Sequence, residues 1–310
     1  MINKAKVAVL IPCYNEAVSI ASVVADFKAA LPDATIYVYD NNSNDATASI
    51  AAAAGAVVRK ESLQGKGSVV RRMFADVDAD VYLMADGDST YDPADASRMV
   101  ALILHDRLDM IVGARIASAS EAYRRGHRLG NRLLTAAVAN LFGKRFSDML
   151  SGYRAFSRRF VKSFPAMSDG FEIETELTIH ALELRLPVAE VDTAYKVRSR
   201  GSASKLQTYS DGMRILRLII VLYKNERPFQ FFSAVAAFLG AVALALGTPI
   251  VVTFAQTGLV LRQPTAILAT GLVLLSALNF VTGLILDTVT RGRREMRRLA
   301  YLSIPPADPG

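Results

Sequence analysis

Cysteine and histidine are scarce in this chain, and tryptophan is absent. Cys13 is the only cysteine, which excludes an intrachain disulfide and a zinc site built on thiolates. The three histidines, His105, His127 and His180, lie far apart and show no metal-ligand spacing. Any chemistry must therefore come from carboxylates, basic side chains and the backbone.

Common nucleotide and nucleic-acid motifs are lacking as well. No G-x-G-x-x-G follows an expected strand and no G-x-x-x-x-G-K-S/T occurs, which excludes the usual dinucleotide and P-loop sites. The formal net charge is +7, but no nucleic-acid-reading motif accompanies it, so we expect no nucleic-acid partner. The apolar run at 7–11 is too short for a signal peptide and predicts a buried strand, which leaves the first domain in the cytoplasm.

Long uncharged runs appear after residue 228, at 229–254 and 265–286. As helices they are about 39 Å and about 33 Å long, which exceeds a hydrocarbon core of roughly 30 Å. One such run is also found in buried helices of soluble proteins, but two in tandem predict a transmembrane hairpin over 229–287.

Basic residues predict the orientation of this hairpin. The link carries Arg262 alone, whereas five arginines lie between Arg291 and Arg298. Positive residues favour the cytoplasmic side, so we expect a multi-pass protein of the inner membrane with a basic cytoplasmic tail at 288–310. The segment 209–228 has an amphipathic pattern, which predicts a helix in the headgroup plane or one packed on the first domain.

Residues 1–208 alternate short β-branched runs with helical patterns. Such βα units predict an α/β, Rossmann-like domain with a mainly parallel sheet, and ligands of these sheets bind beyond the carboxyl ends of the strands. We expect strands at 7–11, 35–39, 57–59, 81–85 and 110–113, and helices at 17–30, 45–54, 67–77 and 93–105.

Two aspartates, Asp86 and Asp88, follow the expected strand at 81–85. Side chains at i and i+2 of an extended backbone point the same way, so both carboxylates reach the rim of the sheet. Mg²⁺ takes one or two carboxylates and completes its octahedron with water and substrate phosphates. The pair therefore predicts a site for a hard divalent cation, with an aspartate-rich turn as the alternative.

Polar residues also follow the first two expected strands. Asp40 is placed to accept a hydrogen bond from a base N–H or a ribose hydroxyl, whereas Asn42 and Ser43 either share that role or cap the next helix. Glu16 lies near a helix start, where an acidic residue is favourable in any case.

Lys66 stands between two glycines just before an expected helix. Helix N-termini favour anions, so this lysine predicts a phosphate contact, with a solvated loop lysine as the alternative. Further on, Glu172, Glu174 and Glu176 would share one face of a strand, but the helical pattern that follows favours the first turn of a helix.

In this order the segments resemble glycosyltransferase family 2, in particular its polyprenyl-phosphate glycosyltransferases, which are related to dolichyl-phosphate mannose and glucose synthases. The resemblance extends over residues 7–205, and a C-terminal hairpin also occurs in many family members. The matching segments are Ile11–Glu16, Asp40–Ser43, Gly65–Gly67, Met84–Asp88, Gly113–Arg115, Ser147–Arg154 and Arg198–Lys205.

The resemblance implies a GT-A fold, a nucleotide-sugar donor, Mg²⁺ or Mn²⁺, and inversion at the anomeric carbon. It assigns the nucleoside to Pro12, Asn15, Glu16 and Asp40, the metal to Asp86 and Asp88, and donor or acceptor phosphates to Arg115, Arg198 and Lys205. A UDP-linked donor is expected ahead of GDP-mannose. The sequence leaves open whether the chain forms a homo-oligomer.

The implied acceptor is a polyprenyl phosphate, and the implied product is a lipid-linked sugar for cell-envelope glycans. This phosphate is largely ionised at neutral pH and needs no strong base, so the site must hold two anions in line and neutralise them. We expect Asp88, Arg115 and Asp148 to take part in catalysis. Asp148 either orients the acceptor or acts as a base, with a turn cap or an arginine partner as the alternative.

Two other functions compete. A processive polysaccharide synthase also joins this fold to membrane helices, but it typically needs a Q-x-x-R-W segment, and this chain has no tryptophan. A non-catalytic membrane adaptor on the same scaffold would need neither the acidic pair nor Lys205, and all three are present. We therefore expect an enzyme.

Overall fold

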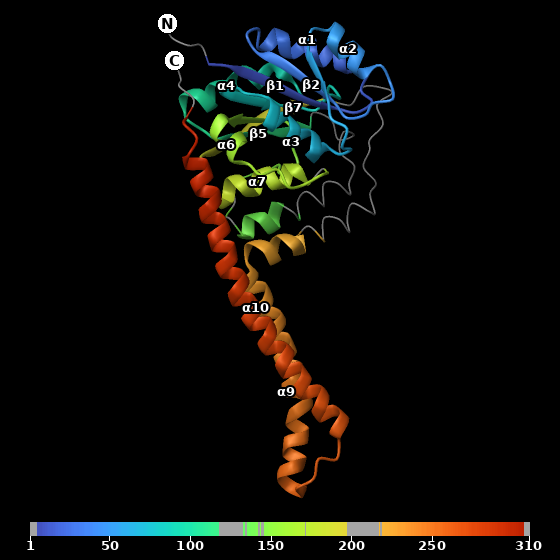
Figure 1. Ribbon diagram of the computed structural model, residues 1–310, viewed down its shortest axis with the longest axis vertical. Helices are drawn as coiled ribbons and strands as arrows, with labels where there is room; N and C mark the ends of the chain where they lie inside the picture. The colour runs from blue at the N-terminus through green and yellow to red at the C-terminus, as the bar shows by residue number, and fades with distance from the viewer. Residues whose placement is uncertain are drawn as a thin grey trace. The chain divides into compact units, whose positions relative to one another are not determined.

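A computed structural model describes residues 5–117, 133, 135–141, 143, 146–170, 172–196, 217 and 219–306. By its contacts the chain divides into two units (Figure 1). The first consists of Met1–Gly212 with Arg297–Gly310, and the second of Met213–Met296.

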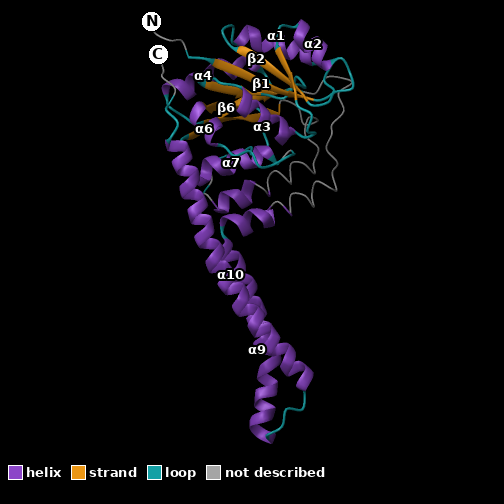
Figure 2. Cartoon of the chain, in the orientation of Figure 1, coloured by secondary structure: helices purple, strands orange, loops and turns teal. Residues whose placement is uncertain are grey.

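The first unit is built on a seven-stranded sheet in the order β3-β2-β1-β4-β6-β5-β7. Its strands are drawn in orange in Figure 2. Its strands pair in parallel except for β6, which runs antiparallel to both of its neighbours. The mainly parallel sheet is confirmed, and β6 is an addition to it. The strands are β1 (Val7–Cys13), β2 (Thr35–Asp40), β3 (Val57–Lys60), β4 (Val81–Met84), β5 (Met110–Ala117), β6 (Arg154–Ser157) and β7 (Val188–Tyr195).

Helices cover both faces of this sheet (Figure 1). On one face lie α1 (Ile20–Ala30), α2 (Thr47–Ala53), the short helix η1 (Pro93–Asp95) and α4 (Ala96–His105). On the other lie α3 (Lys66–Asp76), α6 (Arg158–Ser163) and α7 (Ile173–Glu183). Because both faces are covered, β4 is buried at all of its residues, as is typical of strands in a parallel sheet.

The reversed strand β6 brings a further segment to the carboxyl edge of the sheet. Its first residue, Arg154, pairs with Met84 at the end of β4 and with Val112 in β5. The loop before Arg154 therefore arrives at the edge where Asp86 follows β4. This is the edge at which parallel α/β sheets bind their ligands.

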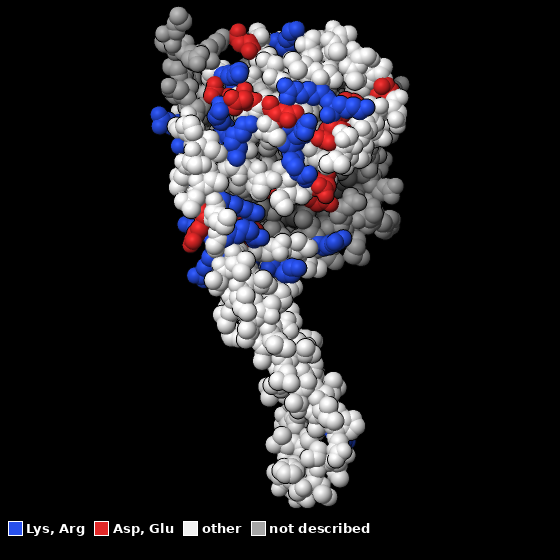
Figure 3. Space-filling model, in the orientation of Figure 1, with Lys and Arg blue, Asp and Glu red and all other residues white. Residues whose placement is uncertain are grey.

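The second unit contains α9 (Pro228–Thr257) and most of α10 (Gln263–Leu302). Both helices are long and apolar enough to cross a membrane, by length and composition. They pack through small residues: Ser276 Oγ donates to the carbonyl of Ala236 at 2.8 Å, and a side chain at Gly283 would meet Phe232. In the view of Figure 3 this hairpin is almost free of charge.

Helix α10 continues through the residues for which the sequence predicted a basic tail. The arginines here are bound by the protein: Arg291 pairs with Asp287 at 2.8 Å and Arg294 with Glu226 at 2.9 Å. In the first unit, Arg297 pairs with Glu183 at 2.5 Å. A count of basic residues does not reveal the carboxylates that meet them. Of the predicted helix at 209–228, residues 219–226 are helical, and residues 209–216 and 218 lie outside the described residues.

Candidate active site

Asp86 and Asp88 stand at the end of β4 in different environments. The side chain of Asp86 is 29% exposed, and its Oδ1 lies 2.5 Å from the ammonium nitrogen of Lys66. Asp88 is buried, and its Oδ1 accepts hydrogen bonds from the hydroxyl of Thr90 at 2.6 Å and from its N–H at 3.2 Å. Asp86 is therefore the more accessible carboxylate of the pair.

Two glycines allow neighbouring groups to lie close to this pair of aspartates. A Cβ at Gly87 would lie 2.6 Å from the sulfur of Cys13, and one at Gly152 would lie 2.5 Å from Oδ2 of Asp86. The N–H of Gly152 donates to the hydroxyl of Tyr91 at 2.9 Å. The backbone before β6 thus lies directly against the Asp86 carboxylate, which would have to shift to make room for a side chain at Gly152.

The chemistry of this donor set fits a Mg²⁺ or Mn²⁺ ion that shares its coordination with a substrate. The described residues contain no group of three or more His, Cys, Asp and Glu side chains suited to hold a metal by themselves. Two carboxylates are nevertheless enough, because Mg²⁺ usually takes one or two and keeps water and phosphate oxygens as its other ligands. Asp86 and Asp88 would hold such an ion.

Lys66 is the first residue of α3, and its side chain is only 9% exposed. Its ammonium nitrogen lies 2.5 Å from Oδ1 of Asp86 and 2.5 Å from Oε1 of Glu174. Burial lowers the pKa of Lys66, but the carboxylates of Asp86 and Glu174 outweigh it and raise that pKa above its ordinary value. Lys66 is therefore a charged, held group, and the alternative of a solvated loop lysine is wrong.

Backbone carbonyls surround the turn that carries Lys66. Gly65 has a φ of 129°, and a Cβ at Gly65 or Gly67 would collide with the carbonyl groups of Ser168 and Asp169. The N–H of Gly67 donates to the carbonyl of Asp169 at 3.0 Å. Both glycines are required for this close packing.

Asp40 ends β2, and only 5% of its surface is exposed. Its Oδ2 accepts a hydrogen bond from the N–H of Ser43 at 3.3 Å. Its Oδ1 is buried and has no hydrogen-bond partner in the described part of the chain. Buried polar atoms are nearly always paired, so an unpaired carboxylate oxygen at a ligand-binding edge indicates an acceptor for a ligand N–H or O–H.

The β1–α1 turn is tied to the β2–α2 turn through Asn15. Asn15 has a φ of 53°, a left-handed conformation that asparagine tolerates, and its Oδ1 accepts from the N–H of Asn44 at 2.8 Å. The N–H of Asn15 donates to the hydroxyl of Ser43 at 2.9 Å. Ser43 therefore does not cap α2, which has Ala46 at its N-cap position.

The other residues predicted to hold the nucleoside lie in the same region. Pro12 is partly buried within β1. Glu16 is buried, and its N–H donates to the hydroxyl of Thr47 at 2.8 Å. The amide of Asn42 donates to the carbonyl of Ser62 at 2.8 Å. Asn42 does not cap α2 either, since Ala46 occupies the N-cap position.

Asn41 organises the loop that leads to Lys66, and the sequence did not single it out. Its amide donates to the carbonyls of Glu61 at 2.9 Å and Leu63 at 2.8 Å. Its Oδ1 accepts from the N–H of Gly65 at 2.8 Å. The signal in the sequence that could have revealed this role was an asparagine almost directly after an expected strand.

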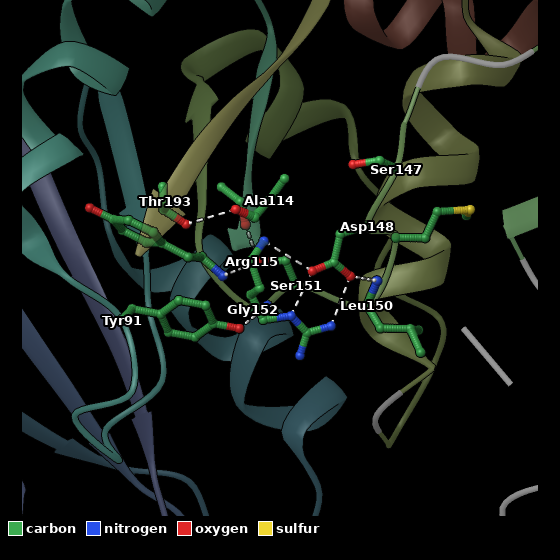
Figure 4. Close-up of polar contacts among 12 residues, drawn as sticks. Tyr91, Ala114, Arg115, Ser147, Asp148, Leu150, Ser151, Gly152 and Thr193 are labelled. Carbon is green, nitrogen blue, oxygen red and sulfur yellow. Dashed lines mark hydrogen bonds and ion pairs between the residues drawn. The ribbon is translucent and has the colours of Figure 1, made fainter. Parts of the chain in front are cut away.

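Arg115 and Asp148 form a two-pronged ion pair (Figure 4). The Arg115 Nε lies 2.6 Å from Oδ2, and its second guanidinium nitrogen lies 2.8 Å from Oδ1. The guanidinium also stands over the ring of Tyr195, 5.5 Å from its centroid. Of the roles left open for Asp148, the structure contains the arginine partner.

The loop that carries Asp148 is fixed from two sides. Glu190 in β7 accepts from the N–H of Ser147 at 2.7 Å and from that of Asp148 at 3.0 Å. Ser151 donates its hydroxyl to the carbonyl of Gly113 at 2.6 Å. This loop is thus bound to β5 and β7 by hydrogen bonds before it enters β6.

Arg154 lies beneath this loop, fully buried, and the sequence gave it no separate role. Its guanidinium donates to the carbonyls of Ser151 at 2.9 Å and Met149 at 2.6 Å, and to the hydroxyl of Thr178 at 2.8 Å. Burial lowers its pKa to about 10, so it stays charged at neutral pH. Its position inside the Ser147–Arg154 segment was the available signal.

Glu174 is a further residue that the sequence missed as part of the site. It lies in the first turn of α7, as the helical interpretation predicted, and it is buried. Its pairing with Lys66 joins α7 to the carboxyl edge of the sheet. Arg198 and Lys205, predicted to bind phosphates, lie outside the described residues.

Comparison with known proteins gives one family. A model of glycosyl transferase family 2 matches residues 8–164. Glycosyltransferase AglJ of Haloferax volcanii is 36% identical over 250 residues, which are 80% of this chain and 81% of that protein. The dolichyl-phosphate hexose transferase of the same organism is 29% identical over 220 residues, 71% of this chain and 95% of that protein.

A solved structure agrees on the fold. Glucosyl-3-phosphoglycerate synthase from Mycobacterium tuberculosis, in complex with Mn²⁺, UDP-glucose and phosphoglyceric acid, superposes with a TM-score of 0.58 at 24% identity, covering 71% of this chain and 79% of that one. At this identity the similarity establishes the fold. With the family model and the AglJ alignment, it follows that the chain belongs to glycosyl transferase family 2 and is a glycosyltransferase of the GT-A fold.

Proposed function

We propose that the protein transfers a hexosyl group from a nucleoside-diphosphate sugar, with UDP as the favoured nucleotide, to a polyprenyl phosphate, with inversion at the anomeric carbon. The observation that carries this proposal is the position of Asp40 and of the Asp86–Lys66 pair at the carboxyl edge of a GT-A sheet. The three side chains supply an acceptor for a nucleoside, a carboxylate for a cation and an ammonium for a phosphate.

The nucleoside is assigned to the ends of β1 and β2. The unpaired Oδ1 of Asp40 is an acceptor for a base N–H or a ribose hydroxyl. Asn15 connects the two turns by hydrogen bonds and so fixes the positions of Asp40 and Glu16 relative to each other. These contacts bind and orient the donor without taking part in bond breaking.

The diphosphate is assigned to the end of β4 and the start of α3. A divalent cation on Asp86 and Asp88 would neutralise the charge that develops on the leaving diphosphate. Lys66 lies beside Asp86, at a helix N-terminus, where the backbone also favours anions. The chain thus offers both a side-chain cation and a helix dipole to the leaving group.

The acceptor is inferred from its chemistry and from a relative. One relative is named as a dolichyl-phosphate hexose transferase, and this chain has two helices suited to a membrane. An acceptor phosphate oxygen forms the new bond to the anomeric carbon while the bond from that carbon to the diphosphate breaks. The acceptor is already ionised near pH 7, so the step needs no proton acceptor, and the pairing of Asp148 with Arg115 agrees with this.

The two apolar helices support a reaction at a membrane surface. Both helices would cross the inner membrane, with the catalytic domain and the C-terminus on the cytoplasmic side, as the arginine count predicts. Arg115, Arg198 and Lys205 are the candidate contacts for the lipid phosphate. A chain anchored in this way meets a lipid-borne acceptor in the plane of the bilayer.

Purified full-length protein in detergent tests the proposal. UDP-glucose, MnCl₂ and a polyprenyl phosphate should give a lipid-extractable sugar and one equivalent of UDP, and omission of the metal should abolish both. Other UDP-hexoses and GDP-mannose serve as competing donors. Nucleotide release that does not depend on polyprenyl phosphate, or no release with any of these donors, would contradict the proposed acceptor or the reaction itself.

A further inference from the structure

The ammonium group of Lys66 lies between carboxylates from two distant parts of the chain. Asp86 follows β4 at the carboxyl edge of the sheet, and Glu174 lies in the first turn of α7. Both carboxylates lie 2.5 Å from the ammonium nitrogen. The two differ in exposure, since the Asp86 side chain is 29% exposed and that of Glu174 is 5% exposed.

A divalent cation on Asp86 would compete with Lys66 for this carboxylate. Lys66 occupies Oδ1 of Asp86, and an ammonium group and a metal ion on one carboxylate repel each other strongly at such distances. This repulsion therefore favours withdrawal of the ammonium from Asp86 while it remains in the site. A charge this deeply buried cannot withdraw without another partner, because an unpaired buried charge is very costly.

Glu174 has the features of that partner. Its Oε1 already binds Lys66, and its Oε2 is buried without a hydrogen-bond partner in the described part of the chain. A half-satisfied buried carboxylate is costly for stability alone, so its presence beside an ammonium group indicates a use for the second oxygen. Lys66 can leave Asp86 and stay charged, held by Glu174 at the start of α3.

We propose that Glu174 is a positioning residue for Lys66, which it retains when a divalent cation displaces the ammonium from Asp86, so that Lys66 passes from that carboxylate to the leaving diphosphate. No covalent bond changes and no proton is transferred in this exchange. The inference rests on the proposed function in one respect, the binding of a metal and a diphosphate beside Asp86.

Binding of Mn²⁺ to the full-length protein without substrate tests this exchange independently of turnover. In Lys66→Met, Asp86 has lost its built-in competitor, so Mn²⁺ should bind about tenfold tighter or more, whereas UDP should bind more weakly. In Glu174→Gln, Lys66 loses one of its two described carboxylate partners and is bound more strongly to Asp86, so Mn²⁺ should bind about tenfold more weakly. Free Mn²⁺ is counted by electron paramagnetic resonance, and UDP binding is measured by calorimetry.

The double variant Lys66→Met/Glu174→Gln decides whether Glu174 acts through Lys66. It removes both charges together and so leaves no new unpaired ion between them. If the proposal holds, Glu174→Gln has no effect on Mn²⁺ affinity once Lys66 is absent. An equal effect in both backgrounds would show that Glu174 acts by its own charge and would overturn the proposal, as would unchanged Mn²⁺ affinity in either variant that lacks Lys66.

Lys196→Met is the matched control for loss of one positive charge. Lys196 pairs with Asp92 at 3.2 Å, and its side chain is 55% exposed, so Mn²⁺ affinity should stay within about twofold of wild type. Failure of the proposed function has a separate signature: wild-type protein would then bind neither Mn²⁺ nor UDP. Thermal unfolding in the same detergent confirms that each variant is folded before its affinity is compared.

Discussion

The donor side of the site and the loop at 147–153 satisfy their carboxylates in opposite ways. On the donor side, Asp40 keeps a buried oxygen without a described partner, and Asp86 is partly exposed. In the loop, both oxygens of Asp148 bind Arg115. The difference indicates that the donor side is built to receive a ligand, whereas Asp148 holds an arginine and a loop in place.

The largest effect is expected on the donor side. Asp86→Asn keeps the size of the side chain and leaves Lys66 paired with Glu174, so the fold should persist. Because the variant removes a ligand that positions the cation beside the leaving group, kcat should fall by on the order of a thousandfold even when the metal is saturating. The rate of lipid-linked sugar formation at saturating metal measures this effect. A decrease in kcat of less than about tenfold would show that Asp86 is not a ligand of the catalytic cation.

Beneath the loop we expect a large effect on stability. Arg154→Met removes the donor for two carbonyls and a hydroxyl in the interior. Unpaired buried groups cost about 1–3 kcal/mol each, so a loss of about 3 kcal/mol should lower Tm by roughly 6–12 °C.

The control for this variant is Arg158→Met, four residues along the chain. Arg158 pairs with Asp78 at 2.9 Å, and that carboxylate is 61% exposed, so its removal should change the free energy of unfolding by less than about 1 kcal/mol. Equal Tm values for the two variants would show that Arg154 does not support the loop.

We expect the stability of the protein to depend on pH because of His180, which lies in α7 together with Glu174 and Thr178. Burial, and then the charge of Arg297, lower the pKa of His180 to about 3. The unfolded chain takes up a proton on this histidine as the pH falls below about 6.5, and the folded chain does not until the pH nears 3. The contribution of His180 to the free energy of unfolding is therefore fully present above about pH 6.5. It decreases as the pH falls towards 3, and the loss is about 2 kcal/mol at pH 5.

His180→Leu should remove this component of the acid dependence. Tm measured at pH 7.5 and at pH 5.0 should differ less in His180→Leu than in wild type, by an amount that corresponds to about 2 kcal/mol. The exposed His105, replaced in the same way, controls for the loss of a histidine. Parallel acid dependence in wild type and His180→Leu would contradict the assignment.

The smallest effect on turnover is expected at Asp148. If this carboxylate only positions Arg115 and its loop, Asp148→Asn should lower kcat by no more than about tenfold and leave the pH dependence of kcat unchanged. A general base contributes about 10²–10⁴ in rate and imposes an acidic limb on the pH profile. Loss of that limb in Asp148→Asn would show that Asp148 acts as a general base and would contradict a purely positioning role.

Local patterns in the sequence predicted the strands that lead to the candidate site well. The apolar runs at 7–11, 35–39 and 81–85 correspond to β1, β2 and β4, and the polar residues that follow them meet at one edge because parallel strands end there. The roles of the individual residues in binding metal or nucleoside stay predictions.

The rest of the site depends on contacts between distant residues. Strand β6 is four residues long and pairs antiparallel between β4 and β5, which no local period reveals. The pairing of Lys66 with Glu174 joins residues from α3 and α7, and the fully buried Arg154 reads in sequence like any surface arginine. Tertiary structure decided all three.

The hairpin shows the same division. Hydropathy placed the two apolar runs correctly within α9 and α10. It did not show that α10 continues to Leu302, because charged residues with good helix propensity extend a helix without an apolar signal. Nor did it show that Glu226 and Glu183 meet the arginines that follow.

A structure of the full-length protein with Mn²⁺ and UDP tests the assignment of the donor side most directly. We expect Mn²⁺ bound to Asp86 and Asp88, a uridine N–H or hydroxyl within hydrogen-bond distance of Asp40 Oδ1, and Lys66 on the diphosphate and Glu174. UDP bound elsewhere, with Lys66 still paired to Asp86 and no metal beside it, would contradict that assignment.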